Sequence, residues 1–222
     1  MIGIIGSKLM DHRKKTSLTH SKTQGSIHSE LELLYKSGSF EKLYAEAVNF
    51  CLGFPSDTFI WNMRAAAALK LGKYTDAILA FKRVEQIEPR SHIACFNLGK
   101  VFLDATDFKA SIKALNRSIK LNPKYTKAYD LKIRALFQNG QIEEAIATAK
   151  FVLKKNPNFD AFHNNLGAIY KDTDRYLPAL DCFKKAVKIQ PQNNKYRLNL
   201  ANVEFDLFRF RSAIENYKIV IS

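Results

Sequence analysis

Residue types that often carry catalysis or bind metal ions are present in this 222-residue chain, but their spacing fits neither role. Cys51, Cys95 and Cys182 lie far apart, with no CxxC pair and no close histidine, so they indicate neither a zinc site nor a disulfide framework. No Ser-His-Asp, Cys-His or paired-carboxylate arrangement stands out from the rest of the pattern. We therefore predict that this chain by itself is not an enzyme, and that it needs no cofactor and no metal ion.

The N-terminal residues offer two further motifs, and both have an ordinary explanation. His12, His20 and His28 are evenly spaced but have no acidic or cysteine partner that would complete a metal site. The segment Gly3–Lys8 lacks the GxxxxGK[ST] spacing and the preceding strand of a phosphate-binding loop. Residues 1–23 are basic, rich in Ser and Thr and poor in apolar periodicity, so we predict a mobile basic leader there.

Charge and hydropathy limit the classes of partner. The net charge is +14, but the basic excess is spread along the chain, which disfavours nucleic acid as the partner while leaving an RNA-binding helical array as an alternative. The apolar stretches are far shorter than the roughly 20 residues needed to span a bilayer. We therefore expect no membrane insertion, and the cytoplasm is the default location.

Proline reveals an internal repeat. Five prolines follow one another at a spacing of 34 residues: Pro55, Pro89, Pro123, Pro157 and Pro191. This spacing divides residues 24–222 into the repeats 24–57, 58–91, 92–125, 126–159, 160–193 and 194–222, of which the last is incomplete. Residues 1–23 precede them.

Each repeat carries the pattern of two amphipathic helices. Apolar residues recur with helical spacing, as in Leu166, Ile169 and Tyr170. Small residues at fixed positions, such as Gly167, allow two helices to approach closely, and Gly38, Gly72 and Gly140 suit a tight turn between the helices. Because one helix pair cannot bury its apolar face alone, the pairs must stack. The prediction is an all-α solenoid of antiparallel helix pairs.

These columns resemble the tetratricopeptide repeat (TPR), whose signature is a large residue followed by Leu-Gly, Tyr and later Ala, Phe, Ala and Pro. The fifth repeat matches it with Leu166, Gly167, Tyr170, Ala179, Phe183, Ala186 and Pro191, and has His163 where Trp is usual. The resemblance covers residues 24–222. It implies a TPR α-solenoid coiled into a right-handed superhelix.

The resemblance also implies a function, which is protein–protein interaction through a concave groove lined by the first helix of each repeat. Asparagines in this family hold the backbone of an extended peptide, because an amide can donate and accept hydrogen bonds at once. Basic residues near them favour an acidic segment. The predicted groove residues are Asn62, Asn97, Lys100, Lys127, Arg134, Asn165 and Asn199.

A second function remains open. The incomplete sixth repeat suggests the front of a longer protein, and the repeats resemble the N-terminal TPR region of bacterial sulfotransferases and of glycosyltransferases similar to O-GlcNAc transferase. In that case the chain would recruit substrates or partners for a catalytic domain beyond Ser222. Because Ile214, Val220 and Ile221 have no following helix to cover them, self-association through this end is a further expectation.

Overall fold

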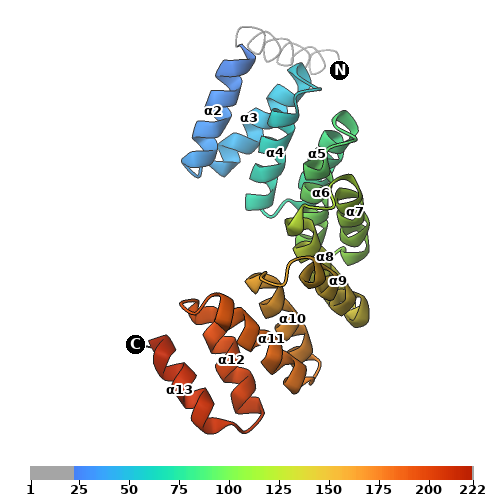
Figure 1. Ribbon diagram of the computed structural model, residues 1–222. Helices are drawn as coiled ribbons and strands as arrows, with labels where there is room; N and C mark the ends of the chain where they lie inside the picture. Colours follow the sequence, from blue (N-terminus) through green and yellow to red (C-terminus); the bar gives the residue numbers. More distant parts are fainter. Residues whose placement is uncertain (1–22, 222) are drawn as a thin grey trace, which may run out of the picture. The chain divides into compact units, whose positions relative to one another are not determined.

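The computed structural model describes residues 23–221, and all regular elements in that part of the chain are α-helices (Figure 1). The predicted leader, except Thr23, lies outside the described residues. The first helices of the repeats are α2 (Gln24–Lys36), α4 (Thr58–Lys70), α6 (His92–Asp104), α8 (Thr126–Gln138), α10 (Asp160–Asp172) and α12 (Asn194–Asp206). The second helices are α3 (Phe40–Gly53), α5 (Tyr74–Ile87), α7 (Phe108–Leu121), α9 (Ile142–Lys155), α11 (Tyr176–Ile189) and α13 (Phe210–Ile221).

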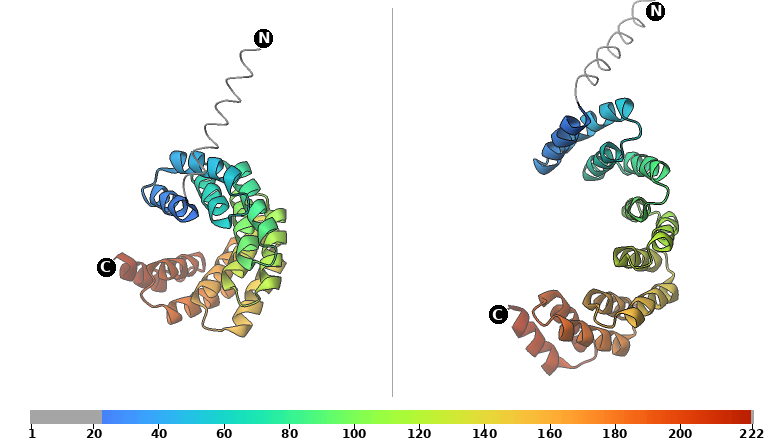
Figure 2. Two further views of the ribbon diagram at one scale, coloured as in Figure 1. Left: turned by 90° about the horizontal axis from the view of Figure 1, so that it is seen from above. Right: turned by 45° about the horizontal axis from the view of Figure 1, so that its top comes forward.

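The helices form two compact units, the first ending at Asp107 and the second beginning at Phe108. In unit 1, α3 packs on both α2 and α4, and α5 packs on α4 and α6. In unit 2, successive helices from α7 to α13 pack on one another, and α10 also contacts α12. Figure 2 shows this stacking of neighbouring helix pairs within each unit. Each unit therefore buries its apolar faces between helix pairs, as the periodicity predicts.

Side chains cap several of the first helices. The Asp57 carboxylate accepts hydrogen bonds from the backbone N–H groups of Phe59 and Ile60 at the start of α4. Thr23, Ser91 and Asn193 cap α2, α6 and α12 in the same manner. Because the first turn of a helix has unpaired N–H groups, a cap that accepts from them sets the residue at which the helix begins.

The turn between the two helices of a repeat has the same backbone conformation in all six pairs. Gly38, Gly72 and Gly140 have φ of 74°, 70° and 78°, which confirms the prediction that glycine serves the turn. Thr106, Asp174 and Phe208 occupy the same place in the other three pairs, with φ of 60°, 58° and 59°. These residues pay a steric cost in the left-handed region that glycine avoids.

The carbonyl of the repeat proline is a hydrogen-bond acceptor at the start of the next repeat. The fourth residue of the repeat donates to it through four different chemical groups. The donors are Trp61 Nε1 to Pro55 (3.1 Å), Tyr129 Oη to Pro123 (3.2 Å), His163 Nε2 to Pro157 (2.8 Å) and an Arg197 guanidinium nitrogen to Pro191 (2.8 Å). The substitution of His163 for the usual Trp therefore keeps the interaction, because what the position requires is an N–H or O–H within reach.

Close packing between α10 and α11 depends on Gly167. A Cβ placed on Gly167 would lie 2.8 Å from Cε1 of Phe183, which is itself buried. Such a contact is too short for any larger residue without movement of the helices. All three cysteines are buried, and burial raises the pKa of Cys51 and Cys182 to about 11, so both thiols stay neutral near pH 7.

Candidate peptide-binding groove

The first helices of unit 1 enclose a hollow of about 660 Å³. It receives side chains from α2, α4, α5 and α6. The lining residues are Tyr35, Asn62, Met63, Ala66, Leu69, Lys70, Tyr74, Phe81, Asn97, Lys100 and Asp104. We call this hollow the unit 1 groove. Its volume lies in the range of sites that take a small ligand or a few peptide side chains.

Two amides lie in the unit 1 groove. Asn62 donates from Nδ2 to the Thr58 carbonyl of its own helix (2.8 Å), and its Oδ1 is buried without a partner among the described residues. Asn97 is half-buried, and its side chain forms no hydrogen bond within residues 23–221. The half-buried Asn97 amide therefore has its full hydrogen-bonding capacity left for a bound molecule.

Cations and aromatic rings surround the amides. Lys100 is exposed and has no ion pair within the described residues, whereas the Lys70 ammonium lies 5.8 Å from the ring centroid of Phe40. Tyr35 and Tyr74 are 40% and 42% exposed, which leaves large apolar surfaces available for contact. Asp104 is the carboxylate among the lining residues, so cations outnumber anions in the groove. The arrangement suits a ligand with negative charge and some apolar surface.

In unit 2 the equivalent amides are bonded to side chains of the preceding repeat. Asn165 on α10 donates to Asp130 Oδ1 on α8 (2.5 Å), and Asn199 on α12 donates to Asn164 Oδ1 on α10 (2.8 Å). These bonds form what we call the unit 2 amide ladder. Each amide still has its own oxygen as an acceptor, but one of its two N–H donors is engaged within the fold.

Asp130 is the charged member of the unit 2 amide ladder. Burial raises its pKa, and the positive charge of Arg134 and the hydrogen bond from Asn165 oppose that rise without cancelling it. Arg134 itself is exposed, as is Lys127 about two turns before it on α8. Part of the cationic charge predicted to attract a ligand is therefore used to stabilise the Asp130 carboxylate.

The structure brings together only part of the predicted set. Asn62, Asn97 and Lys100 line the unit 1 groove, whereas Lys127, Arg134, Asn165 and Asn199 lie on first helices of unit 2. The predicted set lacks three other residues that line the groove, namely Tyr35, Lys70 and Tyr74. The repeat register contained a signal for Lys70, because it lies one helical turn beyond Ala66, which shares its repeat position with Lys100.

Comparisons of sequence identify the repeats. Residues 101–213 match the family described as "Psidin, N-terminal TPR repeats region", and residues 62–126 match the family described as "Tetratricopeptide repeat". Small glutamine-rich tetratricopeptide repeat-containing protein 2 of Mycosarcoma maydis is 31% identical over 103 residues, which are 46% of this chain and 29% of that protein. The chain thus matches less than a third of that relative's length.

Solved structures share the fold at low sequence identity. A crystal structure of MamA is 20% identical, covers 74% of this chain and 90% of its own, and has a TM-score of 0.61. YrrB, described as a TPR protein with an unusual peptide-binding site, is 19% identical over 84% of this chain and 93% of its own, with a TM-score of 0.61. PilF of Pseudomonas aeruginosa is 12% identical over 86% and 87%, with a TM-score of 0.67. Within residues 23–221, no helix has the length and apolar character needed to cross a bilayer.

Proposed function

The chain belongs to the tetratricopeptide repeat family, and from that premise we propose that it is a scaffold whose unit 1 groove binds an extended, acidic segment of another protein. Interaction with proteins or peptides is the general role of these repeats, and the relatives and structural neighbours are typically non-catalytic scaffolds. The observation that carries the finer proposal is the unit 1 groove itself. There Asn97, with an unused amide, lies in one hollow with Lys70 and Lys100.

The ligand backbone would bond to the Asn97 amide. Asn97 can donate to a peptide carbonyl and accept from a peptide N–H at the same time. Contacts of this kind hold an extended backbone in register without selecting particular side chains. Asn62 lines the same groove, but its Oδ1 is buried. The rings of Tyr35 and Tyr74 would cover apolar side chains of the ligand, since both are about two-fifths exposed.

Charge would select among ligands. Lys100 has no partner of opposite sign within the described residues, so a ligand carboxylate would not have to displace one. Lys127 and Arg134 are exposed on α8 of unit 2 and would attract carboxylates there, but Arg134 already interacts with Asp130. Asn165 and Asn199 would contribute less than Asn97, because one of the two N–H donors of each amide is already engaged within the fold.

YrrB supports the proposal through its fold. YrrB is described as having an unusual peptide-binding site, and at 19% identity the likeness to this chain is one of fold. Such a fold places the first helices of successive repeats side by side, which is the arrangement that forms the unit 1 groove. The binding residues proposed here are the lining residues of the unit 1 groove, and none is carried over from YrrB.

The test is a comparison of three variants of the full chain against the same partners. Proteins captured from a lysate by the wild-type chain would be identified, and labelled overlapping peptides covering them would be titrated by fluorescence anisotropy. We expect Asn97→Ala to weaken all bound peptides to a similar degree and Lys100→Glu to weaken the acidic peptides most. Lys42→Glu, an exposed change of the same charge on α3 outside the groove, is the control.

Salt gives an independent measure. The screening length falls from about 10 Å at 0.1 M salt to about 3 Å at 1 M, so affinity for acidic peptides should fall steeply over that range. If Asn97→Ala and Lys100→Glu bind every captured peptide as Lys42→Glu does, the unit 1 groove is not the binding site.

A further inference from the structure

We propose that unit 2 has a second docking site, a lysine-walled pocket between α9 and α11 that binds an apolar anchor side chain flanked by carboxylates in a peptide segment of another protein. This pocket involves none of the unit 1 groove residues, so the proposal stands or falls independently of the function proposed above.

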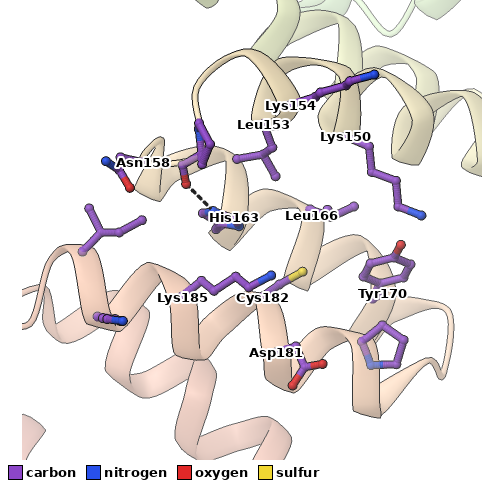
Figure 3. A pocket seen from close by; sticks show the side chains of 14 residues that line it. Lys150, Leu153, Lys154, Asn158, His163, Leu166, Tyr170, Asp181, Cys182 and Lys185 are labelled. Atoms are coloured by element: carbon purple, nitrogen blue, oxygen red, sulfur yellow. Dashed lines mark hydrogen bonds between the residues drawn. The ribbon is translucent and has the colours of Figure 1, made fainter.

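The pocket has a volume of about 910 Å³ and lies wholly within unit 2. Figure 3 shows its side chains converging from α9, from the loop after α9, and from α10 and α11. The lining residues are Lys150, Leu153, Lys154, Pro157, Asn158, His163, Leu166, Tyr170, Pro178, Asp181, Cys182, Lys185, Lys188 and Ile189. We call this the α9–α11 pocket.

The α9–α11 pocket and the unit 2 amide ladder lie on different faces of α10. His163, Leu166 and Tyr170 follow one another at helical spacing and form a single stripe that faces the pocket. Asn165, which points to Asp130 on α8, is two residues after His163 and is therefore rotated by about 200° around the helix. A ligand in the pocket would thus leave the amide ladder accessible.

Lysines stand on both walls of the pocket. Lys150 and Lys154 come from successive turns of α9, and Lys185 and Lys188 from successive turns of α11. All four are exposed, and none forms an ion pair with any of residues 23–221. Asp181 is the one carboxylate among the lining residues, so cations outnumber it four to one. This charge imbalance specifies an acidic partner.

The floor between the two walls is apolar. Leu166 is 4% exposed and Cys182 is 7% exposed, and Leu153 and Ile189 are partly buried beside them. The buried Cys182 thiol stays neutral and serves as an apolar surface. The Lys150 ammonium lies 5.9 Å from the ring centroid of Tyr170, which places a positive charge directly at the edge of this floor.

The walls and the floor together define the ligand. A free inorganic anion would satisfy the lysines and leave the apolar floor in water, and a purely apolar ligand would leave the lysines unpaired. A peptide segment with a large apolar residue and Asp or Glu on both sides matches both surfaces at once. Since the lining lysines come from α9 on one side of the floor and from α11 on the other, carboxylates are needed on both sides of the anchor.

The experiment selects ligands without assuming a sequence. A phage-displayed library of random short peptides is selected on the full chain, and the enriched peptides are synthesised and titrated by fluorescence anisotropy. The double variant Lys154→Glu, Lys185→Glu changes one residue on each wall. The control double variant Lys113→Glu, Lys120→Glu changes the net charge equally at exposed positions of α7, outside the pocket.

We expect a class of enriched peptides with acidic residues around an apolar anchor, whose affinity falls about tenfold or more in the Lys154/Lys185 variant and little in the control. Replacing the anchor of these peptides with Ser should weaken binding as well, and Asn97→Ala should leave it unchanged. If no such class is enriched, or if both charge variants weaken the peptides equally, the pocket is not a docking site. Peptides that tolerate Ser at the anchor would show that only the lysine charge is recognised, which also overturns the proposal.

Discussion

Unit 1 and unit 2 use the same repeat position in different ways. Asn97 in unit 1 and Asn165 in unit 2 are equivalent residues of their repeats, and both were predicted to bind a ligand. Asn97 has no partner among the described residues, while Asn165 donates to Asp130 at 2.5 Å. The residue 35 positions earlier is Asp130 for Asn165 and Asn62 for Asn97. Asp130 accepts the hydrogen bond, whereas the Asn62 amide donates to the Thr58 carbonyl of its own helix and does not pair with Asn97. Repeat position therefore identifies where a side chain lies, and its neighbour decides whether it is available.

The largest expected effect is on stability in unit 2. Asn165→Ala removes the donor to the partly buried Asp130 carboxylate and should cost about 1–2 kcal/mol in the free energy of unfolding. Asn97→Ala removes no hydrogen bond and should change stability by less than about 0.5 kcal/mol. Urea denaturation of both variants measures this difference. Equal losses in the free energy of unfolding would contradict the difference in hydrogen bonding between Asn165 and Asn97.

A smaller effect is expected at the turns between helices. Gly72 in unit 1 and Phe208 in unit 2 hold the same left-handed position, with φ of 70° and 59°. Gly72→Ala should destabilise by about 1 kcal/mol and Phe208→Gly should stabilise by a similar amount, because only glycine avoids the steric cost there. A Cβ on Gly72 would meet nothing within 4 Å, so backbone strain alone is tested.

Thermal unfolding of these two variants provides the measurement, with Gly25→Ala as the control. Gly25 lies in α2, its added Cβ would also meet nothing within 4 Å, and its φ is not positive. Alanine at Gly25 should therefore stabilise the helix. A loss of stability at Gly25 equal to that at Gly72 would contradict the explanation from φ.

The smallest expected effect is on the pH dependence of stability, to which Asp57 in unit 1 and Asp130 in unit 2 contribute with opposite sign. Burial alone would raise the pKa of Asp57, but hydrogen bonds from His28, Gln24 and the Ile60 backbone hold it below the ordinary 3.8. Its stabilising contribution is therefore complete above pH 3.8 and is lost as the pH falls through the lowered folded pKa. The pKa of Asp130 is raised, so its contribution is present below pH 3.8 and is lost as the pH rises through the folded value.

The variants Asp57→Asn and Asp130→Asn test these signs. Asp57→Asn should be less stable than the wild type above pH 3.8, and this difference should shrink as the pH is lowered through the folded pKa of Asp57. Asp130→Asn should gain stability relative to the wild type as the pH is raised through the folded pKa of Asp130. Melting temperatures of the three proteins at matched pH values provide the comparison. Parallel curves for the two variants would contradict the assigned directions.

Much of the fold could be predicted because the repeat is specified by local rules. Proline ends a helix and glycine allows the tight turn, so Pro55 and Gly72 indicate helix boundaries from sequence alone. The left-handed Thr106, Asp174 and Phe208 could not be recognised in that way, because their side chains disfavour the conformation that the turn imposes on them. Tertiary structure overrides the local preference at these three residues.

Less of the candidate site could be predicted, because it depends on contacts between repeats. The bond from Asn165 to Asp130 joins residues of two helices and has no signature in either repeat alone. The α9–α11 pocket was missed entirely, since its lysines lie on second helices, which the prediction did not search for binding residues. These lysines form one surface only because α9 and α11 both pack against α10.

The hydrogen bond from Trp61 to the Pro55 carbonyl has a spectroscopic consequence. Trp61 is the single tryptophan of the chain, and its indole N–H is held where the first repeat of unit 1 meets the second. Intrinsic fluorescence therefore reports the opening of that junction, whereas far-ultraviolet circular dichroism averages over helices of both units. A fluorescence transition that does not coincide with the dichroism transition would show that the chain does not unfold in one all-or-none step, without any label added to the protein.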